Sequence, residues 1–303
     1  MNKEPRLTGD QREELARRAA RAAIKLRMQL SVPSAASLCS VDAAENLGIE
    51  LRFVDIPSME GMYVKSSGTE TKSIILVSAL RPAGRQASTA AHELGHHVFG
   101  HGTRIDQYIP DLDESSASCP DSEEEFLANA FAGFFLMPKS AVDQGFRVRG
   151  YAAEAPTARQ VFEVSGWLGV GYATLIHHMR SSLKLINQNQ AKALLLSQPK
   201  QLRREFLGNV SQADCFVVNQ AWTGRPVDLQ LGDVALVPSG CRTEGSGLAP
   251  GGVTPDGFQI LVAVATGLGR IAAPTWASFT RIRPRDFVGR SIFRHLESAG
   301  DDL

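Results

Sequence analysis

The chain has 303 residues, and its 32 basic and 32 acidic side chains leave no formal net charge. Composition therefore gives no support for a general nucleic-acid or membrane-surface binder, since both rely on an excess of basic charge. No stretch approaches the roughly 20 apolar residues that cross a bilayer. The N-terminal segment mixes acidic residues with arginines and lacks the apolar core of a secretion signal. The four cysteines form no C-x-x-C pair, so we expect a cytoplasmic protein without a disulfide framework.

The first half of the chain alternates helical and strand-like patterns. Apolar spacing and helix stop signals predict four helices, over residues 10–30, from Pro33 to about Gly48, 85–99 and 123–137. Short β-branched runs predict two strands of a small sheet, over residues 51–54 and 73–77. The stretch 102–121 is polar and acidic without periodicity, so it is predicted to be a long loop.

The pattern changes beyond residue 157. Short helices broken at Ser165-Gly166 and at 169–171 are expected, followed by one linking helix over 191–207. After Val210 the apolar runs are separated by Gly, Pro, Thr and Ser, which is typical of strands and turns. The predicted strands cover residues 216–218, 233–237 and 259–265. A terminal helix over 289–298 is predicted to close this β-rich part.

The run His92-Glu93-Leu94-Gly95-His96 carries the strongest chemical signal. Histidines at i and i+4 lie one above the other on one helix face, so His92 and His96 can each give an imidazole nitrogen to one zinc ion. Glu93 points obliquely toward the same ion, where a carboxylate can take the proton of a water that attacks an amide carbonyl. Chance occurrence on a surface helix is the competing interpretation, but the motif lies in a predicted helix that follows a predicted strand.

A catalytic zinc ion needs a third protein ligand. The metzincin pattern is excluded, because Phe99 and Gly102 stand where it requires glycine and histidine. His97 is turned about 100° from His96 round the helix and cannot reach the same ion. His101 lies at the helix end, where we expect a solvent-exposed or capping role rather than a ligand.

The remaining candidates are carboxylates that open the next helix. Glu125 is favoured over Glu124, because the apolar face of this helix leaves Glu125 and Asn129 together, one turn apart. Asn129 is then in a position to orient a metal ligand. Helix capping is the competing interpretation, because Ser122 with Glu125 and Asp121 with Glu124 both match the capping-box spacing.

Together these segments resemble the ImmA/IrrE family of metallopeptidases, a branch of the gluzincins. The resemblance covers about residues 40–140 and is carried by Ser73–Val77, the segment from Arg85 through His96, Glu125-x-x-Ala128-Asn129-x-Phe131-Ala132 and Leu136-Met137-Pro138. It implies a zincin-like core in which His92, His96 and Glu125 bind Zn²⁺ and Glu93 is the catalytic acid/base. It also implies a substrate, namely a helix-turn-helix repressor of a mobile element or stress regulon, whose cleavage releases transcription.

Three parts are expected: a zinc metallopeptidase domain over 1–150, a helix-turn-helix-like helical segment over 151–208, and a β-rich C-terminal domain of unknown role over 209–303. The second part resembles the segment that follows the peptidase core in this family. Direct DNA binding by this segment is disfavoured, because a recognition helix presents cations and polar groups to DNA. The predicted recognition helix offers only His177, His178, Arg180 and Lys184.

Two functions are weighed. The leading one is a zinc-dependent endopeptidase that acts on a protein substrate, a DNA-binding repressor, without a membrane partner. The alternative is a noncatalytic transcriptional regulator or scaffold with a structural zinc site. Structural zinc sites are closed by four protein ligands, commonly including cysteine. No cysteine lies at ligand spacing, and Glu93 would have no role in such a site, so the enzyme is favoured.

Overall fold

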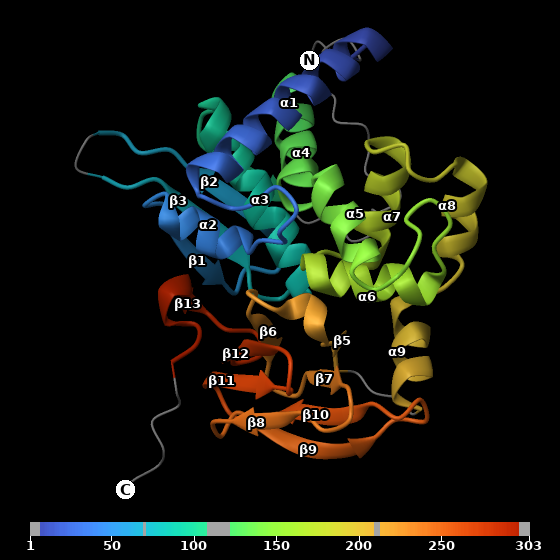
Figure 1. Cartoon of the computed structure of the whole chain (residues 1–303). Coiled ribbons are helices and arrows are strands. Elements are labelled where there is room, and N and C mark those ends of the chain that lie inside the picture. The colour runs from blue at the N-terminus through green and yellow to red at the C-terminus, as the bar shows by residue number, and fades with distance from the viewer. Residues whose placement is uncertain (1–6, 69–70, 108–121, 209–212, 297–303) are drawn as a thin grey trace, which may run out of the picture.

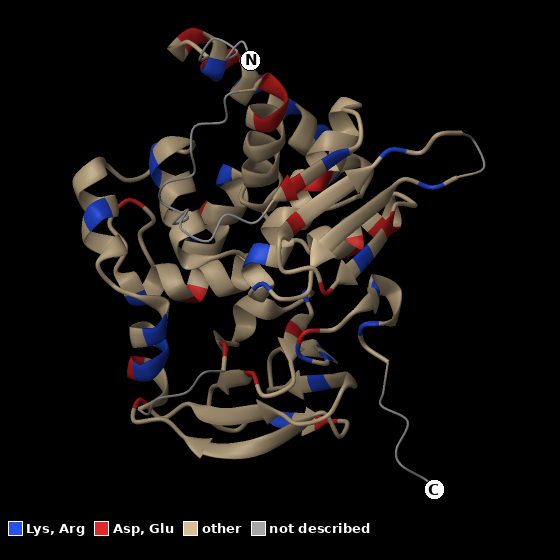
Figure 2. Ribbon diagram, turned by 180° about the vertical axis from the view of Figure 1, so that it is seen from behind, with Lys and Arg blue, Asp and Glu red and all other residues tan. Residues whose placement is uncertain are grey.

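The computed structural model describes residues 7–68, 71–107, 122–208 and 213–296. Helices and a mixed sheet form the N-terminal half, a helical segment follows, and two small sheets form the C-terminal part (Figure 1). The predicted α+β class is confirmed. None of the described helices is long and apolar enough to cross a membrane. In the view of Figure 2, basic and acidic residues are interspersed along the ribbon, in keeping with the balanced composition.

The N-terminal half contains a five-stranded sheet of order β13-β1-β3-β2-β4. Its strands are β1 (Glu50–Val54), β2 (Met59–Val64), β3 (Ile74–Ser78), β4 (Arg104–Gln107) and β13 (Gly289–Arg290). Strands β1 and β3 are parallel, whereas β2 is antiparallel to both β3 and β4. The alternating side chains of β1 and β3 bury Leu51, Phe53, Ile75 and Val77.

The two strands predicted in this half are confirmed, but two others were missed. Strand β2 contains Gly61 and few β-branched residues, so its sequence does not show a strand pattern. Strand β4 corrects the prediction of a loop over 102–121, because its residues pair with the edge of β2. The remainder of that predicted loop, 108–121, lies outside the described residues.

Five helices accompany this sheet in the N-terminal half: α1 (Gly9–Gln29), α2 (Ser40–Asn46), α3 (Ala83–Phe99), α4 (Glu123–Leu136) and α5 (Lys139–Arg147). Helices α2 and α3 pack directly against its strands. Helix α1 begins with a capping box between Thr8 and Gln11. Helix α3 ends at Gly100, whose φ of 72° suits the left-handed cap position. Both α1 and α3 pack against α4. The four predicted helices are present, although α2 begins at Ser40 rather than directly after Pro33.

The helical segment comprises α6 (Ala158–Leu168), α7 (Tyr172–Ser181), α8 (Gln188–Leu195) and α9 (Pro199–Leu207). The predicted break at Ser165-Gly166 is wrong, because α6 continues to a left-handed cap at Gly169. The single linking helix is also wrong. Pro199 takes the first helical turn of α9 and disfavours helical geometry at Gln198, whose φ and ψ are −90° and 142°.

The C-terminal part has two four-stranded sheets, of order β5-β7-β10-β9 and β6-β12-β11-β8. The strands are β5 (Cys215–Val217), β6 (Val227–Gln230), β7 (Val234–Val237), β8 (Arg242–Glu244), β9 (Leu248–Val253), β10 (Gln259–Ala263), β11 (Gly267–Ala272) and β12 (Ala277–Arg283). The three strands predicted here are present with ends shifted by one or two residues. A 3-10 turn, η2 (Gln220–Trp222), lies between β5 and β6.

The end of the described chain returns to the N-terminal half. Strand β13 pairs with β1, and η3 (Ser291–Phe293) follows it, so the predicted terminal helix over 289–298 is wrong for its described residues. The extended backbone gains ladder hydrogen bonds at the open edge of β1. Ser291 Oγ adds a hydrogen bond of 2.9 Å to the Leu51 carbonyl.

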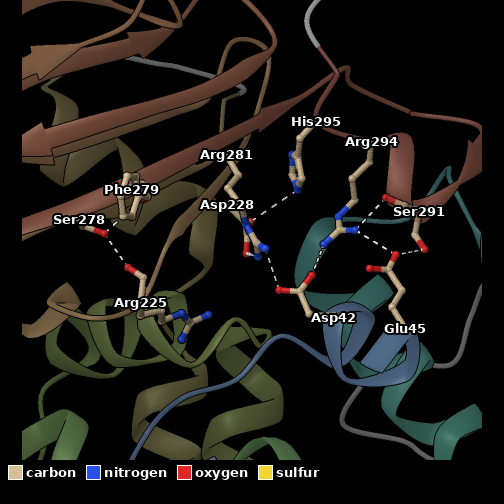
Figure 3. Close-up of polar contacts among 10 residues, drawn as sticks. All are labelled: Asp42, Glu45, Arg225, Asp228, Ser278, Phe279, Arg281, Ser291, Arg294 and His295. Atoms are coloured by element: carbon tan, nitrogen blue, oxygen red, sulfur yellow. Dashed lines mark hydrogen bonds and ion pairs between the residues drawn. The ribbon is translucent and has the colours of Figure 1, made fainter. Parts of the chain in front are cut away.

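Ion pairs join β12 and the segment that follows β13 to helix α2 (Figure 3). The guanidinium of Arg281 joins Asp42 at 2.7 Å and Asp228 at 2.6 Å. Arg294 pairs with Asp42 and, at 3.2 Å, with Glu45. One hydrophobic cluster also extends from Leu15 to Ile282. Contacts thus cross the domain boundaries expected at residues 150 and 208, which remain predictions.

Candidate metal centre

Helix α3 presents the motif residues toward α4. His92, Glu93 and His96 are buried, together with the apolar residues on the same part of the helix. A Cβ at Gly95 would lie 3.0 Å from Ala128 Cα, so the glycine permits the close approach of the two helices. This approach brings the first turn of α4 beside the histidines.

Three potential ligand atoms converge between the helices. The Nε2 atoms of His92 and His96 are 3.0 Å apart. Glu125 Oε2 lies 3.4 Å from His92 Nε2, and Glu125 Oε1 lies 3.6 Å from His96 Nε2. A tetrahedral zinc ion with bonds near 2.0 to 2.1 Å places its ligand atoms about 3.3 Å apart. The separations observed therefore suit a zinc ion bound by two imidazoles and a carboxylate.

The second nitrogen of each histidine has a partner on the other side. His92 Nδ1 lies 3.0 Å from Asn129 Oδ1, which can only accept, so Nδ1 carries the proton and the Nε2 lone pair faces the carboxylates. His96 Nδ1 lies 2.8 Å from His101 Nδ1. The expectation of a solvent-exposed or capping His101 is wrong, because its side chain is buried and contacts His96. The chain turns back after the Gly100 cap, and this turn places the His101 side chain beside the C-terminal end of α3.

The carboxylate of Glu93 is fully buried, and neither oxygen has a hydrogen-bond partner among the described residues. Burial raises its pKa to about 8, against the opposing charge of His92. Space for the group comes from Gly61 on β2, because a Cβ at position 61 would overlap Glu93 Oε1 and Thr89 Cγ2. The neighbouring Asp106 carboxylate raises the pKa of Glu93 further. A buried carboxylate without a hydrogen-bond donor is costly, which points to a ligand or reactant at this position.

The histidines differ in their affinity for protons. Burial opposes the charged form of His92, but its contacts with Asp106 and Glu125 raise its pKa to about 10. Burial and the neighbouring charge of His92 lower the pKa of His96 to about 4. The carboxylates thus concentrate positive charge at His92 Nε2, where a proton and a metal ion would compete for one lone pair.

Comparison with protein families agrees with this geometry. Residues 44–166 match the sequence model of a peptidase family described as the IrrE N-terminal-like domain. This part of the chain is similar to the IrrE N-terminal-like domain of the ImmA/IrrE peptidases. The matched segment runs from α2 to α6 and includes all four residues of the candidate site. A metallopeptidase is therefore the class of protein that the family supports. No curated protein matches the chain.

Within this IrrE-like domain, Asp106 is a site residue that sequence reasoning missed. Its Oδ2 lies 3.1 Å from His92 Nε2, and it groups with His92 and Glu93 as a second set of potential ligands. It reaches the site because β4 pairs with β2 and places Asp106 opposite Gly61. The long-range pairing of β4 with β2, which no local sequence pattern records, brings Asp106 to the site.

Glu124 and Glu125 have different surroundings. The Glu124 carboxylate forms an ion pair with Arg104 and is 42% exposed, whereas Glu125 faces the two histidines. Ser122 caps α4 by accepting a hydrogen bond of 3.2 Å from the Glu125 backbone N–H. The Glu125 side chain is thus turned to the histidines, and Ser122 supplies the cap.

The other histidines considered as candidates from the sequence lie away from His92, His96 and Glu125. His97 Nδ1 lies 3.0 Å from the Tyr63 hydroxyl, on the side of α3 that faces the sheet. In helix α7, His178 is buried and its Nε2 lies 2.9 Å from the Met137 carbonyl. His178 is therefore part of the packing between α7 and the peptidase core, which leaves fewer groups for DNA.

Proposed function

We propose that the chain is a zinc-dependent endopeptidase that cleaves a DNA-binding repressor and so relieves repression. The observation that carries the proposal is the buried Glu93 carboxylate beside three atoms suited to a metal ion. The match of residues 44–166 to the IrrE N-terminal-like family model supports the metallopeptidase class. The repressor substrate rests on the resemblance to the ImmA/IrrE family.

Each residue has a proposed role. His92, His96 and Glu125 hold Zn²⁺, which when bound supplies Lewis-acid polarisation of the scissile carbonyl. Glu93 accepts the proton of the attacking water and delivers it to the amine nitrogen that leaves as the peptide bond breaks. Asn129 orients the His92 imidazole through a hydrogen bond at His92 Nδ1, and His101 orients the His96 imidazole through a hydrogen bond at His96 Nδ1. Gly61 keeps room for the Glu93 carboxylate.

Replacement of Glu93 by glutamine tests the mechanism. Glu93→Gln retains the size of the side chain but removes the base, so cleavage should fall by about 10²-fold or more. Zinc content and melting temperature should stay close to those of the wild type. The assay follows cleavage of candidate DNA-binding repressors, with the products of neighbouring genes tested first and cleavage products identified by mass spectrometry. Glu13→Gln on the exposed face of α1 is the matched control.

The noncatalytic alternative makes the opposite prediction. A structural site needs a fourth protein ligand, and Asp106 is the nearest further carboxylate to His92. Asp106 groups with His92 and Glu93, however, and does not join His96 and Glu125 within the same cluster of described residues. Equal cleavage by zinc-loaded Glu93→Gln and the wild type would overturn the proposed base. Failure of the wild type to cut any candidate repressor would favour the noncatalytic regulator.

A further inference from the structure

A cavity of about 690 Å³ lies between the peptidase core and the C-terminal sheets. Its walls come from the first turn of α3, the turn between α6 and α7, the start of α9, and residues of β6 and β12. His92, Glu93, His96 and Glu125 are not among its lining residues, so it is distinct from the candidate metal centre. Its volume lies within the range of about 300 to 1,000 Å³ that is usual for small-molecule sites.

The three acidic residues that line the cavity are all neutralised by arginines. Asp214 pairs with Arg203 at 2.5 Å, and Asp228 pairs with Arg281 at 2.6 Å. Asp233 lies 3.1 Å from Arg285 and also accepts a hydrogen bond of 2.8 Å from the Gln230 backbone N–H. The acids thus provide no unpaired negative charge for the other cations in the wall.

Two of those other cations are already paired. Arg85 forms an ion pair of 2.8 Å with Glu60. Arg294 pairs with Asp42 and Glu45 on α2, as the dashed lines in Figure 3 show. Arg225 and Arg283 are the lining arginines that remain.

Neither Arg225 nor Arg283 has a carboxylate partner within 4 Å among the described residues. The Nη1 atom of each arginine also has no hydrogen-bond partner among these residues. In Figure 3 the only dashed line to Arg225 reaches its carbonyl oxygen. Arg283 is 8% exposed, and its Nη2 donates to Gln86 Oε1 at 2.5 Å. The guanidinium groups lie over the rings of Trp222 and Phe53, at 5.2 and 4.9 Å from the centroids.

These ring contacts hold the two cations but do not neutralise them. Burial lowers the pKa of Arg225 and of Arg283 to about 10, so both remain charged at neutral pH. An uncompensated buried charge is strongly destabilising unless a counter-ion is present. The cavity that the two side chains line is the space available to such a counter-ion.

Three helix N-termini add positive potential to the same cavity. The N-cap residues Pro82 of α3, Gly171 of α7 and Gln198 of α9 all line it, and none provides a side-chain cap. Backbone N–H groups at the start of a helix carry a partial positive charge and favour anions. Gln86, which binds Arg283, lies in the first turn of α3, so an arginine and a helix N-terminus meet at one point.

The rest of the wall is largely apolar and aromatic. Leu38, Phe53, Phe162, Val170, Tyr172 and Trp222 contribute to it. We propose that the cavity binds a small organic anion, whose carboxylate or phosphate group pairs with Arg225 and Arg283 while its apolar body packs on these side chains. The site is independent of the proposed peptidase chemistry, since it shares no residue with the metal centre.

Fluorescence of 8-anilinonaphthalene-1-sulfonate, an aromatic anion, provides the test on the full-length chain. The wild type should bind the dye saturably, and both phenyl phosphate and benzoate should displace it, whereas neutral benzamide should not. The more effective competitor identifies the preferred head group. Arg225→Gln/Arg283→Gln should weaken dye binding by about 10-fold or more. Arg147→Gln/Arg270→Gln removes the same charge outside the cavity and should bind as the wild type does.

Two results would overturn the proposal. One is displacement by benzamide as effective as that by benzoate and phenyl phosphate, which would show that charge is not recognised. The other is unchanged dye binding by the Arg225→Gln/Arg283→Gln chain. If that chain does not fold, the competition experiment on the wild type still decides, and each single variant should show an intermediate loss of affinity.

Discussion

The two ends of helix α3 have opposite chemistry. Near its C-terminal end, His92, His96 and Glu125 converge with their lone pairs toward one point. At its N-terminal end, Arg283 and Arg225 line a cavity with uncapped backbone N–H groups. The first arrangement suits a cation and the second an anion. The direction of the helix dipole agrees with both, since its positive end lies at the cavity.

The two ends also differ in how the chain assembles them. The metal centre lies on two neighbouring helices, so its residues come from a short part of the sequence. The cavity needs the C-terminal sheets, because the Gln86–Arg283 contact joins residues 197 positions apart. A change at the first site should therefore affect chemistry with little effect on folding, and a change at the contacts around the second should affect stability.

The largest effect is expected from Gly61→Ala. The added Cβ would overlap Glu93 Oε1 and Thr89 Cγ2, so the carboxylate must move from its position beside the ligands. Displacement of the base should reduce cleavage by about 10²-fold, while zinc remains bound. Gly102→Ala is the control, because a Cβ there meets nothing within 4 Å. Full activity of Gly61→Ala would show that Glu93 does not need its observed position.

A smaller effect is expected from Asn129→Ala. The variant leaves His92 Nδ1 without its acceptor at 3.0 Å, so the imidazole loses its orientation. Zinc affinity, measured by competition with a chelator, should fall by about 10-fold. Asn189→Ala, on the exposed surface of α8, should bind zinc as the wild type does. Equal affinities for the two variants would remove Asn129 from the metal centre.

The smallest effect concerns the contacts that join the C-terminal part to α2. Asp42→Asn removes the carboxylate that pairs with both Arg281 and Arg294. We expect the free energy of unfolding to fall by about 2 kcal/mol, below the full effect of breaking a buried pair, because Asp42 is 31% exposed. Urea denaturation measures it. Glu244→Gln breaks the more exposed pair with Arg270 and should cost less than about 1 kcal/mol.

The sequence predicted what depends on local spacing. The histidines at i and i+4 identified the candidate metal-binding face of α3, and the apolar face of α4 separated Glu125 from its neighbours. A capping role for Glu125 remained open, because capping and metal binding both favour an acid at a helix start. Arg104 lies within 4 Å of both acids, and the contacts of Glu125 with His92 and His96 distinguish the two acids in the structure.

Other features depend on pairings that no local pattern records. Asp106 reaches His92 through the β2–β4 ladder, and β13 completes the N-terminal sheet from the far end of the chain. His101 is buried because the chain folds back after Gly100. One error was avoidable, since Pro199 within the predicted helix 191–207 already indicated a break at the preceding residue.

The zinc content of three matched variants tests the central claim most directly. The wild type, Glu124→Gln and Asp106→Asn should each retain about one zinc ion per chain after dialysis, whereas Glu125→Gln should lose it. Inductively coupled plasma mass spectrometry gives the metal content, and circular dichroism confirms that the four proteins are folded. Retention of zinc by Glu125→Gln, with its loss from Glu124→Gln or Asp106→Asn, would contradict the proposed ligand set of His92, His96 and Glu125.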